Sequence, residues 1–162
     1  MKAINADVPS VDALAYLVRY DAETGKFTCR ATGRSLGLDN GNGYLRIYVG
    51  GYRLLAHRVA VALTTGAWPE DIIDHANGIK SDNRLSNLRV ATNALNQGNR
   101  RLSSLNTSGM KGVSRASPST WRAGICFGGV RRHLGTFKTV AEAHAAYQGA
   151  ARILFGEFAR FA

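Results

Sequence analysis

Glycine-containing turns divide the chain of 162 residues into short segments. Turns at Gly41-Asn42-Gly43, Gly50-Gly51 and Gly128-Gly129 lie beside stretches in which side chains alternate as they do in β-strands. Because two or three short strands bury little apolar surface by themselves, each small sheet needs a neighbouring helix or a bound ion to stabilise it. The sequence therefore predicts an α+β fold made of small modules that share little core.

The first module, residues 1–54, is predicted to be rich in β-structure. A short helix is expected from Val11 to Arg19, with Ser10 as its N-cap, and several short strands follow it. Arginines are spread over these strands, where they suit contacts with a DNA backbone and a solvated sheet face equally well. We assign the module as a β-rich region that contacts DNA and leave the second alternative open.

The second module, residues 55–102, is predicted to combine a helix, two short strands and a further helix. The first helix begins near His57 and is stopped by Gly66. We interpret His57 as a histidine that satisfies a nearby backbone group, and we leave it out of the site. A polar, turn-rich linker of residues 103–109 follows.

The third module, residues 110–162, is predicted to be a three-stranded antiparallel sheet packed on one helix. The helix runs from Thr139 to Phe155, with alanines recurring at helical spacing. In the second strand, apolar residues alternate with Arg122 and Cys126. One face of the sheet is therefore expected to pack against the helix, and the other is expected to be free and basic.

Positive charge is concentrated in the middle of the chain. The 21 Lys and Arg outnumber the 11 Asp and Glu, and ten of the basic residues lie from Arg84 to Lys138, where Asp and Glu are absent. Binding to phosphates relieves the self-repulsion of such a surface. The sequence favours a nucleic acid partner over a merely solvated basic face.

Several other classes of protein are disfavoured. No apolar run approaches the roughly 18 residues that span a membrane, and the N-terminus lacks a signal-peptide pattern. Cys29 and Cys126 form no CxxC pair, which fits reduced thiols better than a disulfide or a thiolate zinc site. We expect a cytoplasmic protein without a membrane partner.

Asp74 and His75 form the centre of the predicted active site. On a strand their side chains point to opposite faces, so the carboxylate could hold a cation while the imidazole faces the attacking water. Asn96 lies one turn into the next predicted helix and could reach back, with Asn99 in reserve. Oxygen ligands of this kind favour Mg²⁺ or Mn²⁺ over zinc. Asn87 could hydrogen-bond the imidazole or the scissile phosphate.

Residue chemistry alone leaves a second interpretation of this segment open. Asn77-Gly78, Asp82-Asn83 and Asn87 are residue types that also form turns without any catalytic role.

Four motifs together resemble an HNH endonuclease of the phage and homing type. They are His57-Arg58, Ile73-Asp74-His75-Ala76-Asn77-Gly78, Asp82-Asn83-Arg84-Leu85-Ser86-Asn87-Leu88-Arg89, and Thr92 followed by Asn96 and Asn99. The resemblance implies a ββα-metal nuclease in which His75 is the general base. It also implies Asp74 and Asn96 as ligands of one Mg²⁺ or Mn²⁺ ion per active site, and Asn87 as an orienting catalytic residue. Asn96 stands where other members carry histidine, which disfavours a soft metal.

Residues 110–162 resemble the Apetala/ethylene-response-factor DNA-binding domain. The motifs that carry the resemblance are Gly112-Val113, Trp121-Arg122-Ala123 and His133-Leu134-Gly135-Thr136-Phe137. The resemblance implies that the three-stranded sheet lies in the major groove of duplex DNA. Across the whole chain, the residues expected to contact DNA are Arg84, Arg89, Arg100, Lys111, Ser114, Arg115, Arg122, Arg131, Arg132 and His133.

Together the two resemblances imply an endonuclease that nicks or cuts double-stranded DNA, with no small-molecule substrate. The order of the two modules is similar to that of phage endonucleases, which would act in the cytoplasm of a bacterial host. A monomer is favoured over a homodimer. The alternative is a non-catalytic, sequence-specific DNA-binding regulator that retains an HNH scaffold. An RNA-directed module is disfavoured, because the predicted sheet lacks a strand rich in exposed aromatic residues.

Overall fold

The computed structural model describes residues 8–39 and 41–161. Residues 1–7 and 40 of the first predicted module and residue 162 of the third therefore lie outside the described residues. The chain forms two compact units, residues 1–90 and 91–162. Each unit combines helices with small antiparallel sheets, which confirms the predicted α+β class. We describe the units separately. The finer division into four segments stays a prediction.

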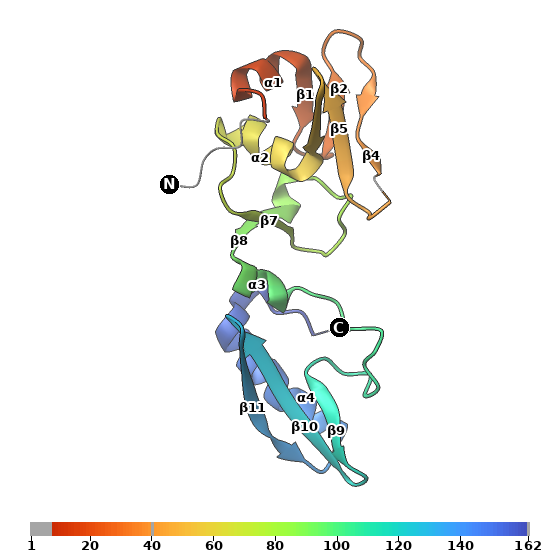
Figure 1. Cartoon of the computed structure of the whole chain (residues 1–162), viewed down its shortest axis with the longest axis vertical. Coiled ribbons are helices and arrows are strands. Elements are labelled where there is room, and N and C mark those ends of the chain that lie inside the picture. Colours follow the sequence, from red (N-terminus) through yellow and green to blue (C-terminus); the bar gives the residue numbers. More distant parts are fainter. Residues whose placement is uncertain (1–7, 40, 162) are drawn as a thin grey trace. The chain divides into compact units, whose positions relative to one another are not determined.

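The N-terminal unit is built from short elements that surround helix α2 (Ala56–Thr65) (Figure 1). Its other helices are α1 (Val11–Leu17) and the 3₁₀ helix η1 (Leu85–Asn87). Its strands form three sheets: β1 (Val18–Asp21), β2 (Lys26–Cys29) and β3 (Ser35–Leu36); β4 (Leu38–Asp39), β5 (Leu45–Val49) and β6 (Tyr52–Leu55); and β7 (Ile72–His75) with β8 (Leu88–Ala91).

The boundaries of α1 and α2 follow from local sequence. The Ser10 hydroxyl accepts a hydrogen bond from the Ala13 N–H at 3.2 Å, so the predicted N-cap is confirmed. The helix ends at Leu17, earlier than predicted, because Val18 is extended and pairs with Cys29 in the first sheet. Helix α2 ends as predicted at Gly66, which has the left-handed φ of 76° that glycine adopts without strain.

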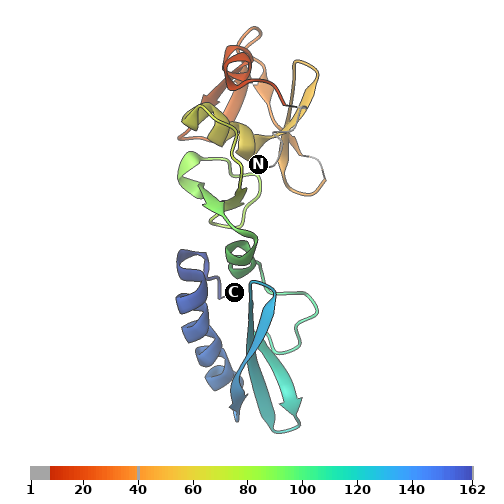
Figure 2. The same ribbon diagram turned by 60° about the vertical axis from the view of Figure 1, so that its left-hand side comes forward.

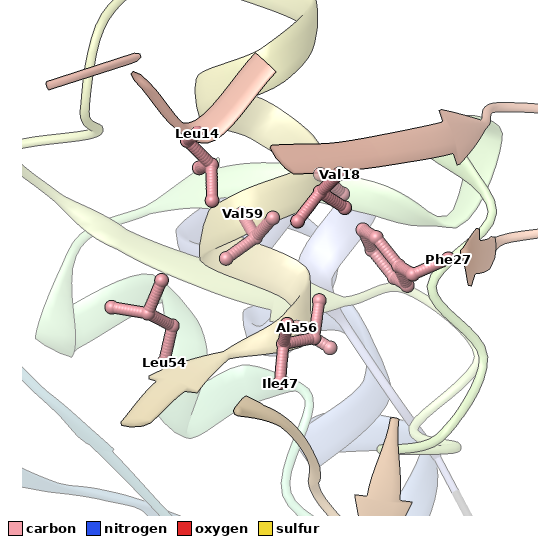
Figure 3. Close-up of a cluster of buried hydrophobic side chains, with 8 residues drawn as sticks. Leu14, Val18, Phe27, Ile47, Leu54, Ala56 and Val59 are labelled. Atoms are coloured by element: carbon pink, nitrogen blue, oxygen red, sulfur yellow. The ribbon is translucent and has the colours of Figure 1, made fainter. Parts of the chain in front are cut away.

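The core of the N-terminal unit forms where α1 and α2 meet the first two sheets (Figure 3). Alanines at positions 56 and 60 of α2 are fully buried, and such small side chains let the helix approach its neighbours closely. The buried residues of this core are Leu14, Val18, Phe27, Ile47, Leu54, Ala56, Val59 and Ala60. The second sheet and α2 thereby share one hydrophobic core.

The C-terminal unit is a three-stranded sheet with a long helix on one face, as predicted (Figure 1, Figure 2). The sheet has the order β11-β10-β9 and is antiparallel. Its elements are α3 (Asn93–Gly98), β9 (Val113–Ser117), β10 (Thr120–Phe127), β11 (Val130–Phe137), α4 (Val140–Phe155) and the 3₁₀ helix η2 (Gly156–Phe158).

Helix α4 begins with a capping box and packs through small and aromatic residues. The Thr139 hydroxyl accepts from the Glu142 N–H, and the Glu142 carboxylate accepts from the Thr139 N–H, both at 3.2 Å. The buried Tyr147 ring lies so close to Gly112 that a Cβ there would approach it to 2.0 Å. Gly112 is therefore required by both its φ of 76° and this contact.

Candidate active site and nucleic-acid interface

Strand β7 places Asp74 and His75 next to each other in a buried part of the N-terminal unit. Asp74 Oδ2 accepts hydrogen bonds from Arg89 Nη2 at 3.0 Å and Nε at 3.2 Å. Arg89 lies on β8, the partner strand of β7. The guanidinium thus holds the predicted metal-binding carboxylate in place. Direct contact of Arg89 with DNA stays a prediction.

The His75 imidazole is 4% exposed and faces the carboxamide of Asn83. The distance from His75 Nε2 to Asn83 Oδ1 is 3.4 Å. Burial lowers the pKa of His75 below its usual value, because the charged imidazolium loses its hydration, although Asn83 and Asp74 act in the opposite direction. The ring is therefore held as a neutral base at physiological pH.

Asn83, for which residue chemistry alone leaves a turn role open, is fully buried beside His75, at 1% exposure. The backbone carbonyl oxygen of Asn83 accepts a hydrogen bond from the Tyr20 hydroxyl at 2.7 Å. Burial raises the pKa of the Tyr20 phenol to about 12. Gly25 at the turn between β1 and β2 lies against the same backbone, where a Cβ would come within 2.5 Å of Arg84 N. The hairpin of β1 and β2 thereby fixes the position of the loop between β7 and β8.

Asn87 closes the loop between β7 and β8. Its side-chain oxygen accepts from the Asn77 N–H at 3.0 Å, and its side-chain nitrogen donates to the Asp82 carbonyl at 2.8 Å. At 7% exposure it joins the two ends of the loop that carries Asn83. The proposed hydrogen bond from Asn87 to the imidazole or the scissile phosphate stays a prediction.

The predicted DNA contact Arg84 is paired with a carboxylate in the same loop. Its Nε donates to Asp82 Oδ1 at 2.8 Å and its Nη2 to Asp82 Oδ2 at 2.6 Å. The Arg84 guanidinium holds the pKa of Asp82 well below its usual range, at about 2. Half of the Arg84 side chain remains exposed, so a phosphate can reach the guanidinium while both hydrogen bonds to Asp82 are kept.

Two rings that sequence reasoning left out of the site pack against His75. The ring centroid of His57, on α2, lies 5.1 Å from that of His75 at an interplanar angle of 77°, and the Tyr44 centroid lies 5.4 Å from His57 and 5.9 Å from His75. The expectation that His57 satisfies a backbone group is wrong, since within the described part of the chain its Nδ1 is buried without a hydrogen-bond partner. Burial, with the nearby His75 and Arg58, lowers the pKa of His57 to about 4.

Lys80 covers the outer side of this ring cluster. Its ammonium lies 4.6 Å from the Tyr44 ring centroid and donates to the Asn42 carbonyl at 3.0 Å. A cation above an aromatic face is attracted to it, so the exposed lysine is held near the site. No sequence motif singled out this contact, because Tyr44 and Lys80 are brought together only by folding.

The residues predicted to hold a metal ion belong to both units. Asp74 lies in the N-terminal unit, whereas Asn96 and the reserve residue Asn99 lie in α3 and at its C-cap. Within residues 8–39 and 41–161, no group of three or more His, Cys, Asp or Glu side chains gathers as a metal site would require. One carboxylate and one carboxamide oxygen, completed by water, are donors that suit a hard divalent ion. The pairing of Asp74 with Asn96 stays a prediction.

The sheet of the C-terminal unit gathers most of its predicted DNA-binding side chains on one face. Strand register places Arg122 opposite Ser114 and Thr136, Gly124 opposite His133, and Cys126 opposite Arg131. Directly opposed residues of an antiparallel pair share a face, and the intervening Ala123 and Ile125 are buried in the cores that α4 completes. Arg122, Arg131, His133 and Ser114 therefore point away from α4.

Three further predicted DNA contacts have other positions. Lys111 Nζ donates to the carbonyls of Gly98 at 2.7 Å and Arg100 at 2.6 Å, and burial lowers its pKa to about 8. Arg115 lies 4.4 Å from the Trp121 ring centroid. Arg132 is opposite Ile125 in register, on the helix side of the sheet. Lys111 holds the end of α3, and a contact of any of the three with DNA stays a prediction.

Residues 54–97 match the family described as HNH endonuclease. An uncharacterized HNH endonuclease of Acanthamoeba polyphaga mimivirus is 33% identical over 119 residues, which cover 73% of this chain and 62% of the relative. A structure titled "DNA binding and cleavage by the HNH homing endonuclease I-HmuI" is 26% identical, covers 52% of this chain and 55% of that chain, and has a TM-score of 0.40. The chain thus spans less than two thirds of the length of either protein.

The family match and the mimivirus relative confirm the predicted similarity to HNH endonucleases for the segment that contains β7, β8 and the loop between them. The predicted resemblance of residues 110–162 to an Apetala-type domain stays a prediction, since the family match ends at residue 97.

Proposed function

We propose that the protein is a DNA endonuclease that hydrolyses phosphodiester bonds in duplex DNA. The observation that carries the proposal is a buried, neutral imidazole next to a carboxylate held by two hydrogen bonds from Arg89, within a segment that matches HNH endonucleases. Hydrolysis requires a base that takes a proton from water and positive charge that stabilises the departing oxygen. His75 can act as the base, and a divalent ion held by Asp74 can supply the positive charge.

The bonding of Asn83 indicates which nitrogen of His75 acts as the base. Asn83 Nδ2 donates to the Ser81 carbonyl at 3.2 Å, so its Oδ1 is the acceptor that faces the imidazole. His75 Nε2 then carries the hydrogen, and Nδ1 carries the lone pair. In the proposed reaction, Nδ1 takes the proton while the water oxygen bonds to phosphorus and the bond to the 3′ oxygen breaks, and the departing 3′ oxygen takes a proton from solvent water. The products have 5′-phosphate and 3′-hydroxyl ends.

Asp74 and Asn96 would hold one Mg²⁺ or Mn²⁺ ion, which would stabilise the charge that develops on the leaving 3′ oxygen. In the protein itself, Arg89 fixes the Asp74 carboxylate by two hydrogen bonds to Oδ2. Asn87 keeps the loop closed, and in the proposal it also orients the scissile phosphate. In this proposal Arg89 orients the Asp74 carboxylate, Asn87 orients the scissile phosphate, and His75 takes the proton from water.

The C-terminal sheet is proposed to dock on duplex DNA. The unit carries ten Lys and Arg against two Asp and Glu. Its free sheet face borders a hollow of about 860 Å³ whose lining includes Arg100, Arg122, Arg131 and His133. A surface of one sign supports binding to phosphates at any sequence, and arginines on a sheet face can add base contacts in the major groove.

The proposed form is a cytoplasmic monomer that nicks DNA, without a small-molecule substrate. Cys29 and Cys126 are free thiols in the described structure, which suits a reducing compartment. None of the helices in residues 8–39 and 41–161 is long and apolar enough to cross a membrane.

Cleavage of supercoiled plasmid in the presence of Mg²⁺ tests the proposal. We expect conversion to nicked circles by the full chain, and loss of conversion when EDTA removes the metal or when His75 is replaced by Ala. Equal cutting by the His75→Ala variant would overturn the assignment of the base. Tight DNA binding that is insensitive to EDTA, with no cutting by the wild type, would instead favour a non-catalytic DNA-binding regulator.

A further inference from the structure

His57 is a buried titratable side chain that the proposed mechanism leaves unused. It is 6% exposed, and in the described part of the chain its Nδ1 atom has no hydrogen-bond partner. A buried nitrogen without a partner lowers the stability of a fold, so packing alone does not explain an imidazole at this position. Residues that break such a rule are expected mainly at functional sites.

The geometry of the three rings connects His57 to the proposed base. The His57 and His75 rings meet edge to face, with centroids 5.1 Å apart and planes at 77°. Tyr44 contacts both imidazoles, at centroid distances of 5.4 and 5.9 Å. Because protein interiors are closely packed, the His75 ring cannot turn far without displacing one of these two neighbours.

The helix that carries His57 is itself held to the strand that carries His75. The Arg58 guanidinium donates to the Asp71 carbonyl at 3.0 Å and to the Pro69 carbonyl, both in the segment that leads into β7. Arg58 therefore holds α2, and with it the neighbouring His57, against the segment that leads into β7.

We propose that His57 is a positioning residue for DNA cleavage: its ring, together with Tyr44, fixes the orientation in which the His75 imidazole receives the proton of the attacking water. This inference rests on the proposed function and extends it to a residue outside the acid–base and metal-binding groups. His57 does not touch the substrate in this role. Its burial also keeps it uncharged, so it adds no repulsion to a protonated His75 during turnover.

Variants that change only the side chain at position 57 test the inference in the whole chain of 162 residues. We expect His57→Leu, which removes the ring, to slow single-turnover cleavage by about 10- to 100-fold, since small misplacements of a reacting group have effects of this size. The dissociation constant for DNA should stay unchanged. His57→Phe, which keeps a flat ring, should restore the rate to within about fivefold of the wild type.

A matched control separates positioning from a loss of folding. Val59→Ala lies on the same helix, fully buried in the core, and should lower stability without changing the cleavage rate of the folded protein. The inference is overturned if His57→Leu cuts at the wild-type rate, if His57→Phe is as slow as His57→Leu, or if Val59→Ala slows cleavage as much as His57→Leu at equal stability. If His57→Leu does not fold, the same comparison is made with Tyr44→Leu at the opposite side of the ring cluster.

A readout that needs no cleavage distinguishes this inference from the proposed function. In long-range proton–nitrogen spectra of the metal-free protein, the wild-type His75 ring should show one tautomer, with the hydrogen on Nε2. In His57→Leu the chemical shifts of the two His75 ring nitrogens should move toward a common average, as expected for exchange between the two tautomers. Unchanged His75 signals in the variant would overturn the inference. A wild-type protein that shows the expected spectra but cuts no DNA would contradict only the proposed function.

Discussion

The two units of the chain use polar residues in opposite ways. The N-terminal unit has 11 Lys and Arg against 9 Asp and Glu, and its buried polar residues include His57, Asp74, His75, Asn83 and Asn87. The C-terminal unit has 10 against 2, and most of its basic side chains lie on the surface. One unit therefore holds polar groups away from water and in fixed contacts, while the other displays unneutralised charge to solvent.

This difference corresponds to two physical requirements of the proposed DNA cleavage. A base works best when its protonation state and orientation are fixed, which requires burial and specific partners. Attraction to a polyanion requires positive charge that water and salt can reach and that DNA can displace. Mutations in the first unit should therefore change the rate of cutting, and mutations in the second should change affinity. The following predictions test this division.

The largest expected effect is on the rate constant of cleavage. His75→Ala should lower it by about 10²- to 10⁴-fold, because the base that takes the proton from water is removed. Affinity for DNA, measured by fluorescence anisotropy, should be nearly unchanged. The exposed histidine of the other unit is the control: His133→Ala should affect binding and leave the rate constant at saturating DNA intact. A variant pair that shows the reverse pattern would contradict the division.

Acid should destabilise the N-terminal unit through His57. The pKa of this group is about 4 in the folded protein and 6.5 in the unfolded chain. The unfolded chain therefore takes up a proton that the folded chain does not, so stability is lost as pH falls from about 6.5 to about 4. The loss corresponds to about 3 kcal/mol. Denaturant unfolding followed by amide signals of the N-terminal unit measures it, and in His57→Phe the pH dependence should be correspondingly smaller.

Gly112→Ala should destabilise the C-terminal unit alone. The new Cβ would lie within 2.0 Å of the Tyr147 ring, at a backbone φ of 76° that disfavours alanine. Overpacking of this kind costs about 1–3 kcal/mol. Thermal unfolding followed by residue-specific amide signals should show a lower midpoint for residues around β10 and α4. A parallel loss in the core around Val59 would mean that the two units do not unfold separately.

The smallest expected effect is a change in affinity and in its dependence on salt. Replacing both Arg122 and Arg131 with Ala should weaken DNA binding by about tenfold and lower the slope of log K against log salt by about 1 to 2. Arg34→Ala, an exposed arginine of the N-terminal unit, is the matched control and should have less effect. A loss for the single control that is half that of the double variant would show that positive charge acts only through the total.

Local patterns predicted the elements well. Ser10 caps α1, Gly66 ends α2, and the alternation along β10 correctly separated the buried Ala123 and Ile125 from the side chains of the free face. These features depend on residues a few positions apart, so their physical causes are present in the sequence. The segment that matches the HNH family was likewise recognised from its motifs.

Contacts between distant positions were not visible in these patterns. Residue chemistry alone leaves a turn role open for Asn83, and folding buries it between His75 and Tyr20, 63 positions earlier in the chain. The sequence predicts a DNA contact for Lys111, which stays a prediction, but it does not predict that the ammonium donates to the carbonyls at the end of α3. In both cases the residue type allows several partners, and these particular contacts follow only from the tertiary structure.

The sequence by itself determined the short helices and strands, the concentration of positive charge in residues 91–162, and the side chains that can move a proton or hold a hard cation. The tertiary structure decided which groups meet: Arg89 with Asp74, Asn83 with His75, and the rings of His57 and Tyr44 with that of His75. The physical reason is that hydrophobic periodicity and charge act locally along the chain. Burial of a specific polar group requires that its partners arrive from elsewhere at the same time.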